Sequence, residues 1–285
     1  MAYKIVVDSS SDIPKELTSK LGIITVPMPV TVDGQGYQEG IDIFPDQFYV
    51  QFNNYKDLPK TSQPNPSLLK ETYEKVLAEG DEVIAIHLSS GLSSTYQTAV
   101  MVSEMCSQPQ KIHVIDSFGA SLGFGLQAIL GCGILKEQEN SGDILPKITK
   151  IRDKMRYVFT IDTLEYLVKG GRVSKTAGFV AGLLDVKPIL HINPKGEIDV
   201  FGKVRSRKAA LRKVVDILER DIVDPEDQVL GISHSASPED AAFVAEDIRA
   251  RFKVKDIVIS DIGCVIGSHV GPGTIALFYQ SEPRR

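Results

Sequence analysis

Hydroxyl side chains gather where an apolar run of the sequence ends. The run Val83–Ile86 is too short for a free-standing helix and predicts a buried parallel strand, and the hydroxyl-rich segment 88–99 follows it. Residues from Tyr96 onward have roughly helical spacing, so the hydroxyls should lie between the carboxyl end of a strand and the N-terminus of a helix. Such a place offers free backbone N–H groups and suits a small anion. Ser93 and Ser94 can equally serve only to cap the helix, which is the commonest use of such serines.

Other polar groups also lie on constrained backbone. Prolines fix the segment 60–67, which holds Thr61 and Ser62 and is predicted to be a loop. Two glycines should end a short helix capped by Asp162 and present Arg172 from a tight turn. His269 lies among glycines and a proline, so we expect its loop to position the ring.

The basic run near residue 205 and the histidines other than His269 are the remaining patterns that could indicate a site. The basic run from Arg205 to Lys213 is either a docking site or, more commonly, a solvated helix face. The remaining histidines lie in or beside apolar strands without the spacing of metal ligands, so they indicate no metal site.

Composition limits the class of protein. The chain has 285 residues, 42% hydrophobic and 24% charged, with a formal net charge of −5, which argues against a nucleic-acid partner. Its three cysteines are widely separated and indicate thiols in a reducing compartment. The first residues lack a positively charged start and a long apolar region, so we expect no signal peptide and a cytoplasmic location.

The segment Phe118–Leu135 has no charged residue but contains five glycines. It is barely long enough to span a bilayer and lacks flanking aromatic residues, which favours a buried helix over a transmembrane one. Each glycine costs a helix up to ~1 kcal/mol relative to alanine, so the pattern suggests that a backbone or a thin ligand approaches closely. The segment is therefore a candidate tunnel wall.

Serines also follow the predicted strands Tyr3–Asp8 and Lys111–Asp116, as they follow the central one. This repeated pattern predicts a parallel sheet with one functional edge, in an α/β domain that spans residues 1–150. A polar stretch, 137–143, should connect it to a second α/β domain of residues 151–285. That domain includes a predicted hairpin over 187–204.

The chain resembles the DegV family of proteins over about residues 3–281. The matching segments occur in the order of the family: Val7–Asp12, Lys60–Pro64, Leu88–Tyr96, Val114–Ser117, Leu164–Arg172, Lys203–Arg205 and His269–Gly273. Ser94 is a small departure, because the family often has glycine there. The resemblance implies a three-layer α/β/α N-terminal domain with a mainly parallel sheet, and a C-terminal α/β domain with a mixed sheet.

The same resemblance implies a carrier of long-chain fatty acids, such as palmitate or oleate, that is not itself an enzyme and has no cofactor. The acid would lie between the domains and be presented to a separate ATP-dependent fatty-acid kinase. The resulting acyl phosphate would go to an acyltransferase of phospholipid synthesis, with transient contact with a membrane surface. The chain has no phosphate-binding GxxxxGK[ST] motif of its own.

Site residues follow from the matched motifs. Thr61 and Ser93 correspond to the hydroxyls that hold the carboxylate, and Ser62 and Ser94 lie beside them. His269, Arg172 and Arg205 correspond to positions near the headgroup, with Arg172 as a contact for the kinase or the phosphate. About a dozen buried methylenes contribute on the order of 10 kcal/mol, whereas one charge-assisted hydrogen bond contributes roughly 1.5–3 kcal/mol. The tail should therefore supply most of the affinity, and the head should fix the orientation of the ligand.

Two other functions stay open. A serine hydrolase would use Ser93, Asp116 or Asp261, and His269, in the chain order of α/β-hydrolases, although Ser94 and Thr95 replace the end of the GxSxG motif. A scaffold or regulator controlled by an anion is also compatible with the sequence.

Overall fold

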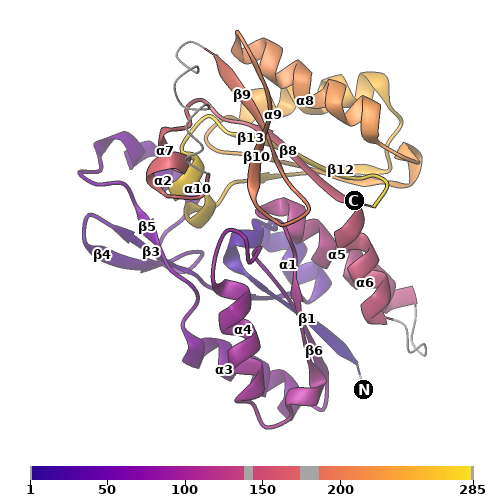
Figure 1. The fold of residues 1–285 in the computed structure, drawn as a ribbon. Coiled ribbons are helices and arrows are strands. Elements are labelled where there is room, and N and C mark those ends of the chain that lie inside the picture. The colour runs from indigo at the N-terminus through magenta and orange to yellow at the C-terminus, as the bar shows by residue number, and fades with distance from the viewer. Residues whose placement is uncertain (1, 138–143, 174–185, 284–285) are drawn as a thin grey trace.

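Two sheets, one from each half of the chain, form the frame of the molecule (Figure 1). The computed structural model describes residues 2–137, 144–173 and 186–283. The N-terminal sheet has the strand order β2-β1-β6-β7 and is parallel throughout. Its strands are β1 (Tyr3–Asp8), β2 (Ile24–Val26), β6 (Glu82–His87) and β7 (Ile112–Asp116). The parallel sheet predicted from the sequence is therefore confirmed.

Helices cover both faces of this sheet. α3 (Pro66–Ala78) and α4 (Thr95–Glu104) share a core with Val6 of β1, whereas α5 (Leu122–Glu137) and α6 (Ile144–Lys154) share a core with Ile5 and Val7. Successive side chains of a strand point to opposite faces, so β1 must be apolar at consecutive positions. α1 (Lys15–Leu21) has no fully buried residue, but its Leu21 packs against the core that contains Ile5 and Val7.

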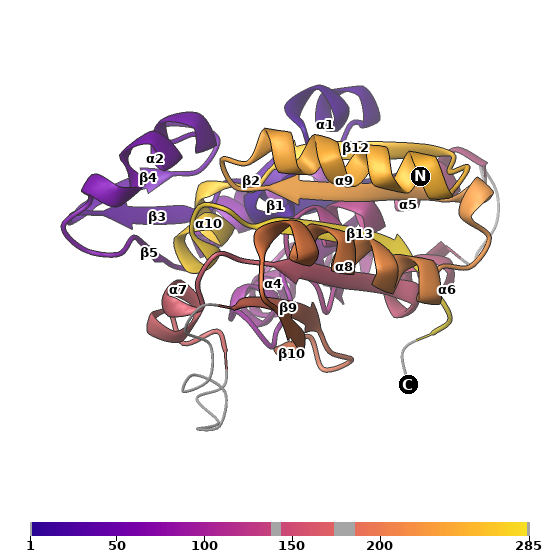
Figure 2. The same ribbon diagram turned by 90° about the horizontal axis from the view of Figure 1, so that it is seen from above.

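The C-terminal sheet is mixed, with the strand order β10-β9-β8-β13-β11-β12. β11 and β12 are parallel, and the other neighbouring strands of this sheet pair antiparallel. The strands are β8 (Met155–Thr160), β9 (Lys187–Ile192), β10 (Ile198–Val204), β11 (Val229–His234), β12 (Asp256–Asp261) and β13 (Ile275–Gln280). α8 (Arg207–Asp221) and α9 (Pro238–Arg251) cover the outer face, so the inner face is left toward the N-terminal half (Figures 1 and 2).

A third, smaller sheet lies beside the junction of the two halves (Figure 2). It has the antiparallel order β4-β3-β5, formed by β3 (Pro29–Val32), β4 (Gln35–Gln38) and β5 (Lys60–Thr61). The helix α2 (Pro45–Gln51) packs with this sheet against the short helix α10 (Cys264–Val270), through a core that includes Phe48 and Val265. α7 (Glu165–Lys169) contacts α10. Single 3-10 turns occupy Ser9–Ser11, Phe52–Asn54, Pro109–Lys111 and Pro225–Asp227.

α5 lies between the two large sheets (Figure 1). Leu122 and Leu126 belong to the core beneath the C-terminal sheet, while Phe124 and Ala128 belong to the core of the N-terminal sheet. Its glycines make room for neighbours: a Cβ at Gly123 would lie 2.3 Å from the Tyr157 ring. The close approach predicted for this segment is thus made by protein side chains. Among the described residues, no helix has the length and apolar character needed to cross a membrane.

Two sequence-based expectations about local structure are wrong. Thr61 lies on β5, where it pairs with Val30, and not in a loop. His269 lies in α10 and not in a loop.

The cap assigned to Asp162 is also wrong. α7 begins after Leu164, and Thr163 Oγ1 accepts a hydrogen bond from Glu165 N at 3.2 Å. Asp162 instead forms an ion pair with Lys187, with Nζ 2.8 Å from Oδ1. The hairpin expected over 187–204 is confirmed by β9 and β10.

The division of the chain near residue 150 stays a prediction. That residue lies within α6, and most of the predicted connection 137–143 lies outside the described residues. Every strand of the N-terminal sheet precedes residue 117, and every strand of the C-terminal sheet follows residue 154. We call these two parts the N-terminal and C-terminal domains.

Two glycines of α5 offer a matched test of its packing. Gly123→Ala should lower the free energy of unfolding by about 1–3 kcal/mol, because the new methyl group overlaps Tyr157 and Phe278. Gly133→Ala, in the same helix but exposed and with no neighbour within 4 Å of its Cβ position, should raise it by up to about 1 kcal/mol. Urea unfolding of both variants measures the difference. Equal effects of the two substitutions would contradict this role of Gly123.

Candidate functional site

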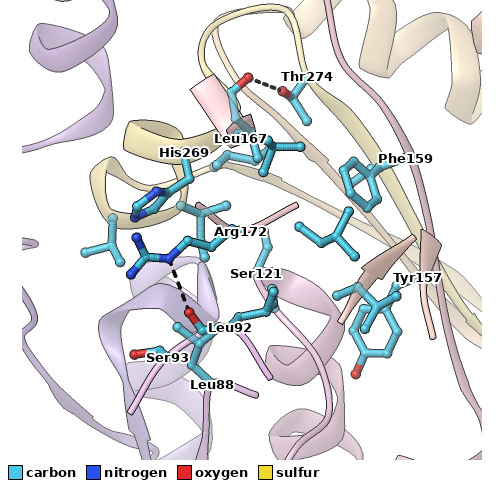
Figure 3. A pocket seen from close by; sticks show the side chains of 18 of the residues that line it. Leu88, Leu92, Ser93, Ser121, Tyr157, Phe159, Leu167, Arg172, His269 and Thr274 are labelled. Carbon is cyan, nitrogen blue, oxygen red and sulfur yellow. Dashed lines mark hydrogen bonds between the residues drawn. The ribbon is translucent and has the colours of Figure 1, made fainter. Parts of the chain in front are cut away.

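A cavity with about 750 Å³ of non-atom space, part of it open to solvent, lies between the domains. Most of its wall is apolar, with residues from both domains (Figure 3). The apolar lining residues are Met28, Leu88, Leu92, Ala120, Phe159, Leu167, Ile192, Ile198, Ile262, Val265, Ile266, Val270, Ala276 and Phe278. The lining is suited to a ligand whose surface is mainly hydrocarbon.

Polar side chains meet at one end of this cavity. Thr61 comes from β5, Ser93 from the segment before α4, Arg172 from the segment after α7 and His269 from α10. In Figure 3, Ser93, Arg172 and His269 lie at the end opposite Tyr157. Segments far apart in the sequence thus form one polar group of side chains, which we call the polar end.

Thr61 and His269 are hydrogen-bonded across the two domains. Thr61 Oγ1 lies 2.8 Å from His269 Nε2, while the buried Nδ1 has no partner among the described residues. A buried N–H without an acceptor is rarer than an acceptor without a donor, so we assign the proton to Nε2. Nε2–H then donates to Thr61, and the Thr61 hydroxyl hydrogen is available to a ligand.

His269 is held in its neutral form. Burial, and to a smaller extent the nearby Arg172 guanidinium, lower the pKa of its imidazole to about 4. Because the unfolded chain takes up this proton near pH 6.5, the contribution of His269 to stability falls as the pH decreases from about 6.5 to about 4. At neutral pH the ring is a hydrogen-bond donor without a charge.

Arg172 connects the domains at the polar end. Its Nε donates to the carbonyl oxygen of Leu92 at 3.3 Å, and its Nη1 donates to the carbonyl oxygen of Gly170 at 2.5 Å. The turn predicted before it is present, with Gly171 in the left-handed region at φ +71°. Among the described residues that line this cavity, Arg172 is the one cation, and a guanidinium suits an anionic partner.

Ser93 lines the cavity beside the start of a helix. Its Oγ accepts a hydrogen bond from Thr95 N at 3.3 Å and lies 2.9 Å from Thr95 Oγ1. α4 begins at Thr95 with Ser94 as its N-cap residue, whose side chain makes no cap bond. The N-cap position expected for Ser93 or Ser94 therefore falls on Ser94, while the Ser93 hydroxyl bonds to the first residue of the helix.

Other residues singled out from the sequence do not line the cavity. Ser62 and Ser94 are exposed, and Ser94 Oγ donates to Gln63 Oε1 at 2.6 Å. Arg205 is exposed after β10, which also fits the solvated-face interpretation of the basic run. Their proposed contacts with a ligand stay predictions.

The structure does not bring together the residues of a serine hydrolase. Asp116 Oδ1 accepts hydrogen bonds from Ser90 N and Phe118 N, and Asp261 pairs with His234 at 3.4 Å. His269 is bonded to Thr61 instead. Neither aspartate lines the cavity.

The residues at the end of the cavity opposite the polar end were not predicted from the sequence. Tyr157 and Phe159 project from β8 and Phe278 from β13, and the Tyr157 hydroxyl accepts a hydrogen bond from Gln127 at 2.6 Å. Nothing in the apolar pattern of these strands shows which face meets a ligand. Ser121 was also missed, although it lies in the uncharged segment 118–135. Among the described residues, no group of His, Cys, Asp and Glu side chains could hold a metal ion.

Fold and cavity together define a two-domain α/β protein that encloses a mainly apolar site between its domains. The chain belongs to the DegV family: the family model described as "Uncharacterised protein, DegV family" matches residues 2–282. A DegV domain-containing protein of Caldanaerobacter subterraneus is 34% identical over 278 residues, which cover 98% of each chain.

Solved structures of the family are similar over the whole chain. A DegV family protein from Thermus thermophilus, described by its fatty acid binding, has a TM-score of 0.92 and 28% identity over 99% of this chain and 100% of that chain. DegV of Bacillus subtilis, described as a fatty acid binding protein, has a TM-score of 0.88 and 32% identity over 99% of this chain and 100% of that chain. The fold expected from the resemblance is thereby confirmed.

The coupling of Arg172 to His269 can be measured directly. Arg172→Met should raise the His269 pKa above about 4, because a nearby positive charge is removed, but leave it below 6.5, because burial is the larger cause. Imidazole signals followed by NMR during a pH titration give this value. Arg205→Met is the matched control and should leave the His269 pKa unchanged, since Arg205 is exposed outside the cavity. No change in Arg172→Met would contradict the proximity of the two groups.

Proposed function

We propose that this protein binds a long-chain fatty acid in the cavity between its domains. The observation that carries the proposal is the cavity itself, whose wall is mainly apolar and whose one cationic side chain among the described residues, Arg172, lies with Thr61, Ser93 and His269 at one end. This division matches a molecule with one polar head and a long hydrocarbon tail. The fatty acid binding described for the proteins of Thermus thermophilus and Bacillus subtilis supports the same conclusion.

The tail would supply most of the affinity. Burial of about a dozen methylenes contributes on the order of 10 kcal/mol before the cost of ordering the chain. The lining near Phe159 and Phe278 consists of large apolar side chains, and Tyr157 has its hydroxyl bonded to Gln127. A hydrocarbon tail can contact these three rings without depriving the Tyr157 hydroxyl of its hydrogen bond.

The head would be held by the polar end. Thr61 and Ser93 offer hydroxyl groups, and α4 begins at Thr95, close to Ser93, with the positive end of its dipole. Arg172 supplies a positive charge, which favours the ionised carboxylate. His269 contributes through Thr61, whose hydroxyl hydrogen it leaves available to the ligand.

We further propose that the protein is a carrier that presents the acid to a separate ATP-dependent kinase and then passes the acyl phosphate to an acyltransferase. The support is the resemblance of the sequence to the carrier subunits of such systems, together with the absence of a GxxxxGK[ST] motif from the chain. In this scheme Arg172 meets the developing phosphate or an acidic surface of the kinase. The cytoplasm is the compartment proposed for these steps.

Lipid binding is tested on the purified protein. Native mass spectrometry should show a long-chain fatty acid bound to the fresh protein, or uptake of added palmitate or oleate after delipidation. Thr61→Ala and Ser93→Ala should each weaken binding by about tenfold or more, because each removes a hydrogen bond to a charged group. Ser94→Ala is the control and should change it less than about twofold, since its hydroxyl bonds to Gln63 outside the cavity.

Two results would contradict this assignment. The first is a protein that carries no lipid and takes up neither acid. The second is stable labelling of Ser93 by a fluorophosphonate, which would favour the hydrolase.

The carrier role makes a separate prediction. The pure protein with ATP should form no acyl phosphate, and addition of a family kinase should restore the reaction. Arg172→Ala should impair that reaction while leaving the fatty-acid content nearly normal, because the tail supplies most of the affinity. Acyl phosphate trapped by hydroxylamine, with lipid content measured by mass spectrometry, separates the two effects. Loss of the bound acid with kinase binding intact would assign Arg172 to ligand binding instead.

A further inference from the structure

Two carboxyl groups of the N-terminal domain hold the beginning of α10 in the C-terminal domain. Asp12 Oδ1 accepts a hydrogen bond from Gly263 N at 3.0 Å, and Glu39 Oε1 accepts one from Val265 N at 2.8 Å. The two side chains are buried, with Asp12 7% and Glu39 5% exposed. The N-cap residue Gly263 makes no side-chain cap bond of its own, so Glu39 supplies an acceptor for the first turn from another domain.

The contact between Gly263 and the carboxyl groups is close. A Cβ at Gly263 would lie 2.4 Å from Glu39 Oε1 and 2.7 Å from Asp12 Oδ1. The backbone of Gly263, with φ −65° and ψ 173°, is one that any residue adopts. Glycine is therefore needed here for space and not for its backbone freedom.

α10 connects these carboxyl groups to the polar end. One turn after Val265 it carries His269, whose Nε2 meets Thr61. Val265, Ile266 and His269 line the cavity, whereas Asp12 and Glu39 do not. Any displacement of the first turn of α10 therefore moves the ring that faces Thr61.

The carboxyl groups also contact the opposite wall of the cavity. The second oxygen of Asp12 is hydrogen-bonded to the hydroxyl of Ser121, which lines the cavity. The second oxygen of Glu39 accepts a hydrogen bond from Ser9 Oγ at 2.5 Å, and the same Oγ accepts one from Met28 N at 3.1 Å. Met28 lines the cavity too. The two side chains thus join α10 to the N-terminal part of the wall.

We propose that Asp12 and Glu39 are positioning residues, which hold α10 from the other domain and so set the place of His269 at the polar end. The proposal rests on the proposed function in that the polar end is the site of the fatty-acid head. Asp12 and Glu39 touch no ligand themselves. Their effect on binding passes through α10.

A neutral side chain of the same shape should serve nearly as well as Glu39. Burial raises the pKa of Asp12 well above its usual range and also raises that of Glu39, and the negative charge of Glu39 raises the pKa of Asp12 further. Glutamine keeps the oxygen that accepts from Val265 N and can donate to Ser9 Oγ. Glu39→Gln is therefore the conservative variant, and Glu39→Ala is the disruptive one.

The test measures the environment of His269 in the full-length, delipidated protein. Glu39→Ala should raise the His269 pKa from about 4 toward 6.5, because a displaced α10 exposes the ring to water. Glu39→Gln should keep it near 4. Glu82→Ala is the matched control: it also removes a carboxylate that bonds to a histidine, His113 at 2.8 Å, but one outside the cavity. It should leave the His269 pKa unchanged.

Fatty-acid affinity is a second measurement on the same variants. We expect binding of palmitate or oleate to weaken about tenfold in Glu39→Ala and less than about twofold in Glu39→Gln, the size of effect typical of a lost helix cap. Because the titration uses lipid-free protein, its result does not depend on whether the wild type binds lipid. A wild type that binds neither acid would refute the proposed function without altering the outcome for His269.

Gly263→Ala keeps the proposal testable if Glu39→Ala does not fold. Its methyl group pushes the carboxyl groups away from α10 without removing them and should raise the His269 pKa in the same direction. The double variant Glu39→Ala/Gly263→Ala should differ little from Glu39→Ala alone, since the side chain that the methyl group meets is already absent. An unchanged His269 pKa in folded Glu39→Ala or Gly263→Ala, or a similar rise in Glu82→Ala, would overturn the proposal.

Discussion

The burial of α5 between two sheets is the constraint on which the other features depend. A helix is about 10 Å across with its side chains, so α5 keeps the facing sheets apart by a fixed gap. Along the helix that gap is filled by Leu122 and Leu126 on one side and by Phe124 and Ala128 on the other. Around its N-terminus, at Ala120 and Ser121, the wall belongs to the cavity. The helix that joins the domains therefore also leaves the space between them.

The polar end combines one charge with several neutral donors. Arg172 is the cation of the lining, and His269 is neutral because burial and Arg172 both lower its pKa. An anionic head with a single charge balances this arrangement, whereas a dianion would need a further cation from outside. A carboxylate therefore suits the isolated protein. Its phosphorylated form would gain from the basic groups of a second protein.

Much of the frame could be predicted from the sequence, because strands buried on both faces are continuous apolar runs and serines mark where they end. Ser93 was found this way. The helix position of His269 was missed, because the glycines around α10 are typical of a loop, and its first turn is capped by Glu39 from a distant part of the chain. Pairing of β3 with β5 was missed for the same reason: β5 has only two residues, and its partner lies far away in sequence. Local pattern contains no information about such contacts. The family resemblance located Thr61, but no local pattern did.

The groups that form the polar end are far apart along the chain. Thr61 and His269 are separated by 208 residues, and Asp12 and Gly263 by 251. Such contacts form late, since a long loop must close before any of them is made. During synthesis the N-terminal sheet can assemble while the ribosome still holds α10, but the inner faces that later enclose the cavity then remain uncovered. The nascent chain is therefore exposed to aggregation through these faces until α10 and β13 emerge, and its ligand site forms only after they do.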